Sequence, residues 1–70
     1  MRIVKIKMLF NDWAEGKWLA EGTEFVALRI FDNYNDVGIR IDEGPIYGYL
    51  IICRESAITY FVSVDFAEEI

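Results

Sequence analysis

Apolar and polar residues alternate with a period of two through most of this chain, which is the pattern of strands whose two faces meet different surroundings. Isoleucine and valine together number 15 and leucine only four, a balance that favours strands. The one helix candidate, Trp13–Glu21, is interrupted by Gly16. The alternation predicts five strands, at Arg2–Phe10, Thr23–Phe31, Val37–Ile41, Tyr47–Cys53 and Thr59–Phe66.

The five segments differ in how clearly one face is apolar. Val37–Ile41 alternates most cleanly, so Val37, Ile39 and Ile41 are expected inward. Thr23–Phe31 is apolar on both faces, as in a strand that bends across two sheets or is covered by another element. Tyr47–Cys53 is nearly all apolar and is predicted to be central. In the first segment, one face is predicted to consist of Val4, Ile6, Met8 and Phe10.

The connections between these segments carry turn residues. Asp32–Asp36 is rich in Asp and Asn, and Asp42–Gly48 contains Gly-Pro and a second glycine. Arg54–Ala57 is short enough for one 3₁₀ turn, and Phe66–Ile70 is expected to be a frayed acidic tail. Because 70 residues form at most one domain, residues 1–70 are predicted to be a single all-β domain closed as a small five-stranded barrel.

Composition changes this picture by suggesting self-association. Hydrophobic residues make up 54% of the chain, although a domain this small buries only ~60% of the surface that its unfolded form exposes. A disulfide within the chain is excluded, because Cys53 is the only cysteine. A second copy covering the surplus apolar surface remains as the route to added stability. We therefore expect a homo-oligomer.

The net charge of −5 narrows the class of partner. The first ten residues contain three basic residues and no acidic one, so the remainder carries a charge of −8. Such a body repels phosphates, which argues against nucleic-acid binding and suits a basic protein partner. No apolar run approaches the ~20 residues that span a bilayer, and no signal peptide is visible. The sequence thus predicts a cytoplasmic protein without membrane contact, with Cys53 reduced.

Candidate catalytic chemistry is sparse. The chain has no histidine, and a zinc site would also need a second thiol. Cys53 ends an apolar strand, where a buried thiol is inert. The carboxylates at Asp32, Asp36, Asp42 and Glu43 do not follow the spacing of a calcium loop and are interpreted as solvated turn residues. The prediction is a protein that is not an enzyme and that holds no metal or cofactor.

The aromatic residues are the better candidates for function. Trp13 and Trp18 stand in a loop with Asp12 and Glu15, which gives an apolar anchor with an acidic rim. The alternative is that one or both tryptophans fold back to plug the barrel. Several other rings fall on the second faces of their strands, more than one small core can cover: Phe25, Phe31, Tyr34, Tyr47, Tyr49 and Phe61. The predicted partner-binding residues are Asp12, Trp13, Glu15, Trp18, Tyr34, Tyr47 and Tyr49.

The first half of the chain resembles an SH3-type domain. In that family, an "ALYDY"-like strand end leads into a long RT loop, then to a bulky residue, two polar residues, a glycine and a strand. The corresponding residues here are Met8, Leu9, Phe10, Asp12 and Trp13, and then Leu19, Glu21, Gly22 and Thr23. The resemblance implies an SH3-like barrel, with OB-like closure left open. Where SH3 domains that bind proline-rich peptides have a tryptophan and a proline, this chain has Val37–Gly38 and Cys53–Arg54.

These observations give two main functional hypotheses. The first is a non-enzymatic protein–protein interaction module that self-associates through the acidic aromatic loop and the surplus aromatic strand faces. The alternative is a small acidic inhibitor of the kind that phages and other mobile elements encode, which binds and occludes a basic, nucleic-acid-handling host protein. A third hypothesis is a single-strand nucleic-acid binder that stacks bases on its aromatic rings. The negative charge of residues 11–70 argues against it.

Overall fold

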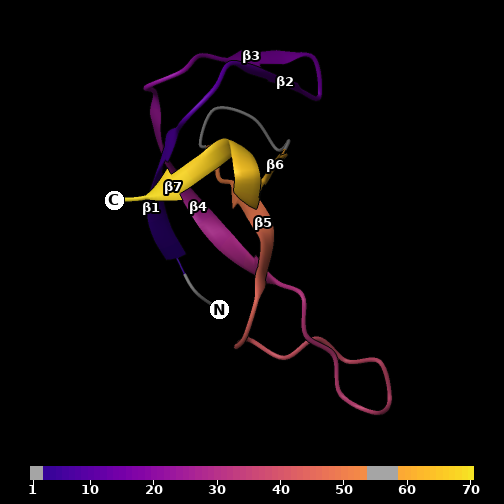
Figure 1. Cartoon of the computed structure of the whole chain (residues 1–70). Coiled ribbons are helices and arrows are strands. Elements are labelled where there is room, and N and C mark those ends of the chain that lie inside the picture. Colours follow the sequence, from indigo (N-terminus) through magenta and orange to yellow (C-terminus); the bar gives the residue numbers. More distant parts are fainter. Residues whose placement is uncertain (1–2, 54–58) are drawn as a thin grey trace.

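In a computed structural model, which describes residues 3–53 and 59–70, the chain forms seven strands and one short 3₁₀ helix. The elements are β1 (Ile3–Met8), β2 (Asp12–Ala14), β3 (Lys17–Leu19), β4 (Glu24–Phe31), β5 (Ile46–Ile51), β6 (Tyr60–Ser63), η1 (Val64–Phe66) and β7 (Ala67–Glu69). Five strands form one antiparallel sheet in the order β6-β5-β4-β1-β7, and β2 and β3 form a separate hairpin. Figure 1 shows the large sheet curling into a half-barrel. The predicted all-β class is confirmed.

The last strand, β7, extends the sheet beyond the first strand, β1. β7 pairs antiparallel with β1, so that Met8 lies opposite Ala67 and Ile6 lies opposite Glu69. The prediction of a frayed tail at Phe66–Ile70 is therefore wrong. Alanine and glutamate have little intrinsic preference for strands, but pairing with β1 supplies backbone hydrogen bonds that this preference does not anticipate.

A single 3₁₀ turn, η1, carries the chain from β6 to β7. Its N-cap is Ser63, whose hydroxyl accepts a hydrogen bond from the backbone N–H of Asp65 at 3.4 Å. The fifth predicted strand therefore ends at Ser63 and not at Phe66. The 3₁₀ turn predicted at Arg54–Ala57 lies outside the described residues.

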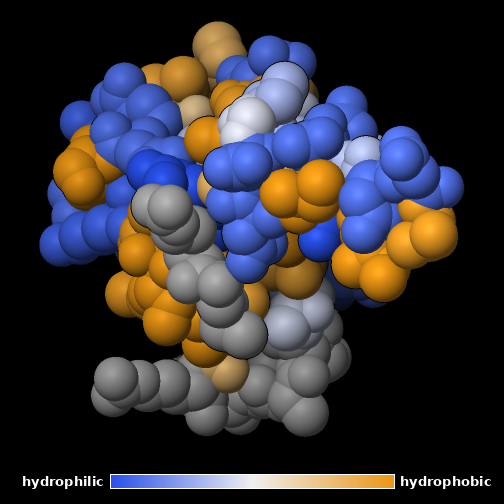
Figure 2. Space-filling model, turned by 90° about the horizontal axis from the view of Figure 1, so that it is seen from below, coloured by the Kyte–Doolittle hydropathy of each residue, from blue (hydrophilic) through white to orange (hydrophobic). Residues whose placement is uncertain are grey.

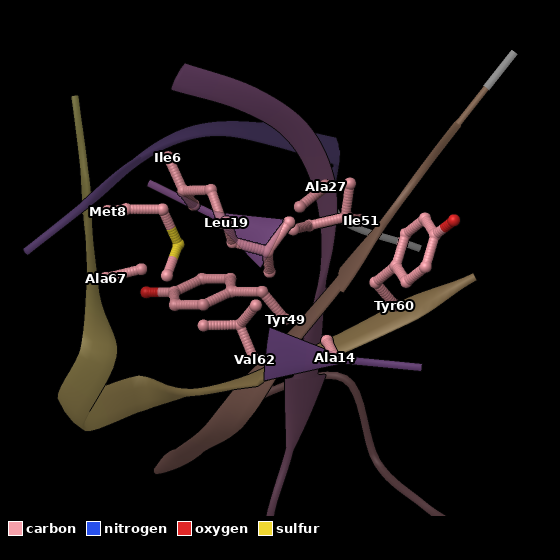
Figure 3. Packing of buried hydrophobic residues seen from close by; sticks show 10 residues of the cluster. All are labelled: Ile6, Met8, Ala14, Leu19, Ala27, Tyr49, Ile51, Tyr60, Val62 and Ala67. Atoms are coloured by element: carbon pink, nitrogen blue, oxygen red, sulfur yellow. The ribbon is translucent and has the colours of Figure 1, made fainter. Parts of the chain in front are cut away.

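The core lies on one face of the sheet, which we call the inner face. Figure 3 shows the Tyr49 ring near the middle of the cluster, with Leu19 from the hairpin close to it and Tyr60 at one side. Ile6 and Val62 are fully buried there. The complete cluster is Ile6, Met8, Ala14, Leu19, Ala27, Tyr49, Ile51, Tyr60, Val62 and Ala67. The hairpin thus covers the inner face of the half-barrel.

Strand β4 shows which of two apolar faces points inward. Ala27 belongs to the core cluster and Phe25 packs against it, and Phe31, on the same side of the strand by alternation, is 5% exposed. Val26, on the opposite or outer face, is half-exposed. The expectation that Phe25 and Phe31 belong to a surplus, uncovered face is therefore wrong. The two phenylalanine rings lie on the covered side of β4, and the smaller aliphatic side chains lie on the other side. β1 departs from its prediction at its end, since Phe10 lies beyond the strand and is exposed.

A β-bulge separates two tyrosines that simple alternation places together. Ile30 pairs with Gly48 and Phe31 with Ile46, which leaves Tyr47 as an extra residue in β5. An inserted residue shifts the alternation of side chains along its strand. Tyr49 accordingly points into the core, whereas Tyr47 is 57% exposed and lies against Phe61, with ring centroids 5.2 Å apart.

Residues 32–45, which we call the arm, connect β4 to β5 and extend away from the sheet in Figure 1. The strand predicted at Val37–Ile41 is absent from this described segment, which contains one isolated bridge between Tyr34 and Arg40. The Asn35 side chain accepts hydrogen bonds from the N–H groups of Val37 and Ile39, at 3.0 and 2.9 Å. This turn replaces strand pairing, because an Asn side chain can bond the backbone just ahead of it.

Candidate protein-interaction site

The tryptophan hairpin (residues 11–22) stands where the sequence predicts a loop. Its two-residue turn, Glu15–Gly16, has positive φ at both positions, 50° and 78°. Such a turn matches the twist of two paired strands, which is why it favours a tight hairpin. Trp13 lies directly opposite Trp18, and Asp12 opposite Leu19. The Glu-Gly pair was the available sequence signal, although glutamate at the first position is less typical than Asn or Asp.

Alternation within the hairpin separates an anchoring face from a solvent face. Leu19 and Ala14 are 1% and 8% exposed and belong to the core. Trp13 and Trp18 point the other way and are 65% and 48% exposed. Their ring centroids are 5.3 Å apart with the planes tilted by 57°. The alternative in which the tryptophans plug the barrel is therefore wrong, because Leu19 fills that position.

Several polar contacts fix the base of the hairpin. The Asn11 side chain accepts a hydrogen bond from the N–H of Glu21 at 2.7 Å, which ties the two legs together. The N–H of Gly22 donates to the carbonyl of Met8 at 2.8 Å. The Lys17 ammonium lies 5.8 Å from the centre of the Tyr60 ring, a cation–π contact with β6. The tryptophan pair therefore stands on a supported base and not on a free loop.

The charge around the tryptophan pair is acidic. Asp12 accepts a hydrogen bond from the N–H of Trp13 at 2.9 Å, and Glu15 is exposed at the turn. Glu21 adds a third carboxylate at the base of the hairpin, while the Lys17 ammonium lies over Tyr60. An exposed aromatic surface on an acidic hairpin can bind a cationic side chain, because ring faces and carboxylates both attract positive charge.

The seven residues predicted to bind a partner do not form one surface. Asp12, Trp13, Glu15 and Trp18 are together on the hairpin, at the top of Figure 1, whereas Tyr34 is on the arm at the opposite end of the molecule. The Tyr34 hydroxyl accepts a hydrogen bond from Arg40 at 2.9 Å, and the Arg40 guanidinium lies 5.5 Å from the centre of the Tyr34 ring.

Neither of the remaining two tyrosines joins the hairpin. Tyr47 lies on the outer face of the sheet beside Phe61. Tyr49 is 3% exposed and belongs to the core, so its prediction as a partner contact is wrong. The bulge at Tyr47 explains why the two tyrosines differ although they are two positions apart.

Tyr49 instead joins an ion pair at the edge of the core. Arg29 Nε donates to Glu69 Oε2 at 2.8 Å, a second Arg29 nitrogen binds Glu69 Oε1, and the Tyr49 hydroxyl donates to Oε2 at 3.1 Å. The hydrogen bond from Arg29 is the main cause that holds the pKa of the Glu69 carboxyl below its usual value. Burial, and then the neighbouring Glu69 carboxylate, raise the pKa of Tyr49. This cluster fastens β7 to β4 and β5.

A second exposed aromatic pair escaped the sequence reasoning. Phe10 and Phe66 are 56% and 37% exposed and meet edge to face, with centroids 6.0 Å apart. The N–H of Leu9 donates to the carbonyl of Phe66 at 2.8 Å. Alternation alone places Phe10 inward, and no local signal marks the bend at Leu9–Phe10 that turns it out.

Neither a cluster of metal-ligating side chains nor a membrane-spanning helix occurs in the described part of the chain. It contains no group of three or more His, Cys, Asp or Glu residues that could hold a metal ion. Cys53 is partly buried rather than fully enclosed. No helix within residues 3–53 and 59–70 has the length and apolar character needed to cross a membrane.

Comparison of the chain with protein-family models, with curated protein sequences and with solved structures finds no match.

Proposed function

We propose that this chain is a non-enzymatic protein-interaction module that self-associates and also binds a basic partner segment through the tryptophan hairpin. The observation that carries the proposal is the exposure of two adjacent tryptophans, 65% and 48%, on a base anchored by the buried Leu19. Tryptophan is the residue most enriched among binding hot spots, where its truncation typically costs ~2 kcal/mol or more. An anchored hairpin also loses little conformational freedom when a partner binds.

An SH3-like barrel is the fold that we propose for the module. Support comes from the chain order, in which a long hairpin follows the first strand of the sheet and a 3₁₀ turn precedes the last. The proposed function differs from binding of proline-rich peptides. The strand after the arm begins at Ile46 and not at a tryptophan, and η1 (Val64–Phe66) contains no proline. In this proposal, Trp13 and Trp18 of the hairpin make the aromatic contact with the partner that the missing tryptophan would make in a peptide-binding SH3 domain.

The proposed partner carries arginine or lysine side chains. A cationic side chain over an exposed tryptophan face contributes ~0.5–1 kcal/mol, and more when the contact is desolvated. The carboxylates of Asp12 and Glu15 also attract a cationic partner, which raises the association rate at low ionic strength. Because Lys17 faces Tyr60, the hairpin's own cation is already engaged in a different contact.

The test is a selection of displayed random peptides on the immobilised protein, followed by titration of the winners into variants. We expect arginine-rich winners whose affinity for Trp13→Ala falls at least tenfold, measured by isothermal titration calorimetry. Tyr34→Ala is the matched control, because Tyr34 is an aromatic residue of similar exposure at the other end of the molecule. Winners that bind Trp13→Ala and Trp18→Ala as tightly as the wild type would refute the hairpin as the site.

A second candidate is the small acidic mobile-element inhibitor that occludes a basic host protein. The arm favours it, because four carboxylates occur within this protruding segment, at Asp32, Asp36, Asp42 and Glu43. Both kinds of binding should weaken with added salt, but binding led by the arm should weaken more steeply, because part of the contact with the tryptophan rings is apolar and is not screened. Salt titration of the selected complexes therefore separates the two functions.

A further inference from the structure

The outer face of the large sheet carries a continuous apolar row across four strands. Cross-strand pairing places four residues in line, one on each of β1, β4, β5 and β6: Ile3, Leu28, Leu50 and Phe61. Ile3 and Phe61 are 62% and 38% exposed. A sheet face that meets water normally carries polar residues at alternate positions, so this row is unusual for a solvated face.

A second apolar group lies next to this row. Val26 is paired with Lys5, and the N–H of Ile52 donates to the carbonyl of Val26 at 3.0 Å, which brings Ile52 alongside. Val26 and Ile52 are 50% and 41% exposed. Figure 2, which views the molecule from below, shows hydrophobic residues in patches among hydrophilic ones.

The charges of the outer face are balanced, which points to a partner of the same kind. The described charged residues there are Lys5 and Lys7 on one side and Glu24 and Glu68 on the other. Lys5 and Glu24 form an ion pair at 3.1 Å, and Lys7 lies opposite both glutamates. Two copies of a chain with a net charge of −5 repel each other over most of their surfaces. A face without net charge is where that repulsion is smallest.

The outer face also has complementary relief. A ridge is formed by the Tyr47 and Phe61 rings, and the Phe61 ring lies directly over Gly48, where an added Cβ would come within 2.5 Å of the ring. A hollow lined by Ile3, Glu24, Val26 and Ile52 of this face also reaches Phe25, which packs against the core. In a two-fold arrangement, one copy's ridge can face the other's hollow and the converse holds at once.

From these observations we infer that the outer face packs against the same face of a second copy of this chain, as two sheets stacked about 10 Å apart. The inference rests on the self-association part of the proposed function and names its surface. It leaves the hairpin available, because Leu19 and Ala14 attach the hairpin to the inner face, on the other side of the sheet. The dimer therefore presents two tryptophan pairs, which can engage a partner with two basic segments by avidity.

The test is Val26→Asp, examined by analytical ultracentrifugation across a concentration series. Each two-fold contact then buries two added carboxylates, so the dissociation constant of the dimer is expected to rise about 100-fold or more. Val37→Asp is the matched control, since Val37 undergoes the same chemical change at 78% exposure on the arm. We expect this control to dimerise like the wild type.

Two outcomes separate the surface from the broader proposal. A wild-type chain that stays monomeric at about 1 mM has a dimer dissociation constant well above that value, which means very weak binding. This result overturns both self-association and its surface. A Val26→Asp variant that dimerises like the wild type overturns the surface alone. If Val26→Asp does not fold, isotope-filtered NMR on the wild type decides. Contacts between the Ile3, Val26 or Ile52 methyls of one copy and the Phe61 ring of the other support the surface, and intermolecular contacts confined to the tryptophans or the arm overturn it.

Discussion

The inner and outer faces of one sheet carry similar apolar side chains and meet different surroundings. On β4, Ala27 and Phe31 are 0% and 5% exposed, whereas Val26 is 50% exposed although it adjoins Ala27. The inner face is closed by Leu19 and Ala14 of the tryptophan hairpin. In a single copy of the chain, no element of the described structure covers the outer face, and its apolar side chains are half-exposed. Whether a residue is buried therefore depends on which element covers its face, and not on how apolar the residue is.

The largest expected difference between the faces is the response to a new charge. Val62→Asp should abolish folding, because Val62 is fully buried and an unpaired carboxylate there costs several kcal/mol against a total stability of ~5–15 kcal/mol. The same substitution at Val26 should leave the fold intact. Far-UV circular dichroism and amide NMR spectra of the two variants compare them directly. A folded Val62→Asp protein would contradict the assignment of the inner face as the core.

A smaller contrast of the same kind exists inside the hairpin. Leu19→Ala should lower the free energy of unfolding by ~2–5 kcal/mol, because it leaves a cavity in the core. Trp18→Ala, next in sequence but on the solvent face, should lower it by about 1 kcal/mol or less. Urea unfolding followed by circular dichroism measures both, since the backbone signal reports the unfolding transition without tryptophan fluorescence. Equal losses would mean that the tryptophans also support the fold.

The smallest expected effect concerns the Arg29–Glu69 ion pair at the edge of the core and its contribution to stability. The folded pKa of Glu69 is lowered, chiefly by the hydrogen bond from Arg29. A lowered folded pKa means that this contribution to stability is fully present above the unfolded value of ~4.3 and is lost as the pH falls through the folded value. Glu69→Gln should therefore cost on the order of 1 kcal/mol at pH 7 and flatten the loss of stability below pH 5.

The matched control for Glu69→Gln is Glu68→Gln. Glu68 is the neighbouring residue on β7 and points to the outer face, away from Arg29. Urea unfolding of both variants between pH 3 and pH 7 gives the comparison. If Glu68→Gln flattens the acid limb as much as Glu69→Gln does, the limb reflects general charge repulsion and not this ion pair.

Strand positions were largely predictable because they depend on local alternation. β1, β4 and β6 fall within predicted segments, and β5 begins at Ile46, one residue before the segment predicted at Tyr47–Cys53. The arm was not predictable in this way, since Val37, Ile39 and Ile41 alternate as a strand does while Asn35 bonds the backbone into a turn. Alternation reports a two-sided environment, but it does not reveal whether a neighbouring strand is present to pair with.

The candidate site was only partly predictable for a similar reason. Trp13 and Trp18 could be selected from residue type, and the short Glu15–Gly16 turn then places them on one face. Tyr49 could not be separated from Tyr47, because the bulge arises from how β5 pairs with β4 and not from either tyrosine. Phe66 likewise becomes a neighbour of Phe10 only when β7 pairs with β1.

That pairing of β7 with β1 also has a consequence in time. Residues 67–69 lie far along the chain from Ile3–Met8, and contacts between distant segments slow the folding of small β proteins. On a ribosome, the sheet cannot be completed until β7 has emerged, whereas the hairpin and the β4–β5 pair are local and can form earlier. In that interval β1 has an open edge that can pair with a neighbouring chain, so the yield of folded protein should fall when synthesis is fast and crowded.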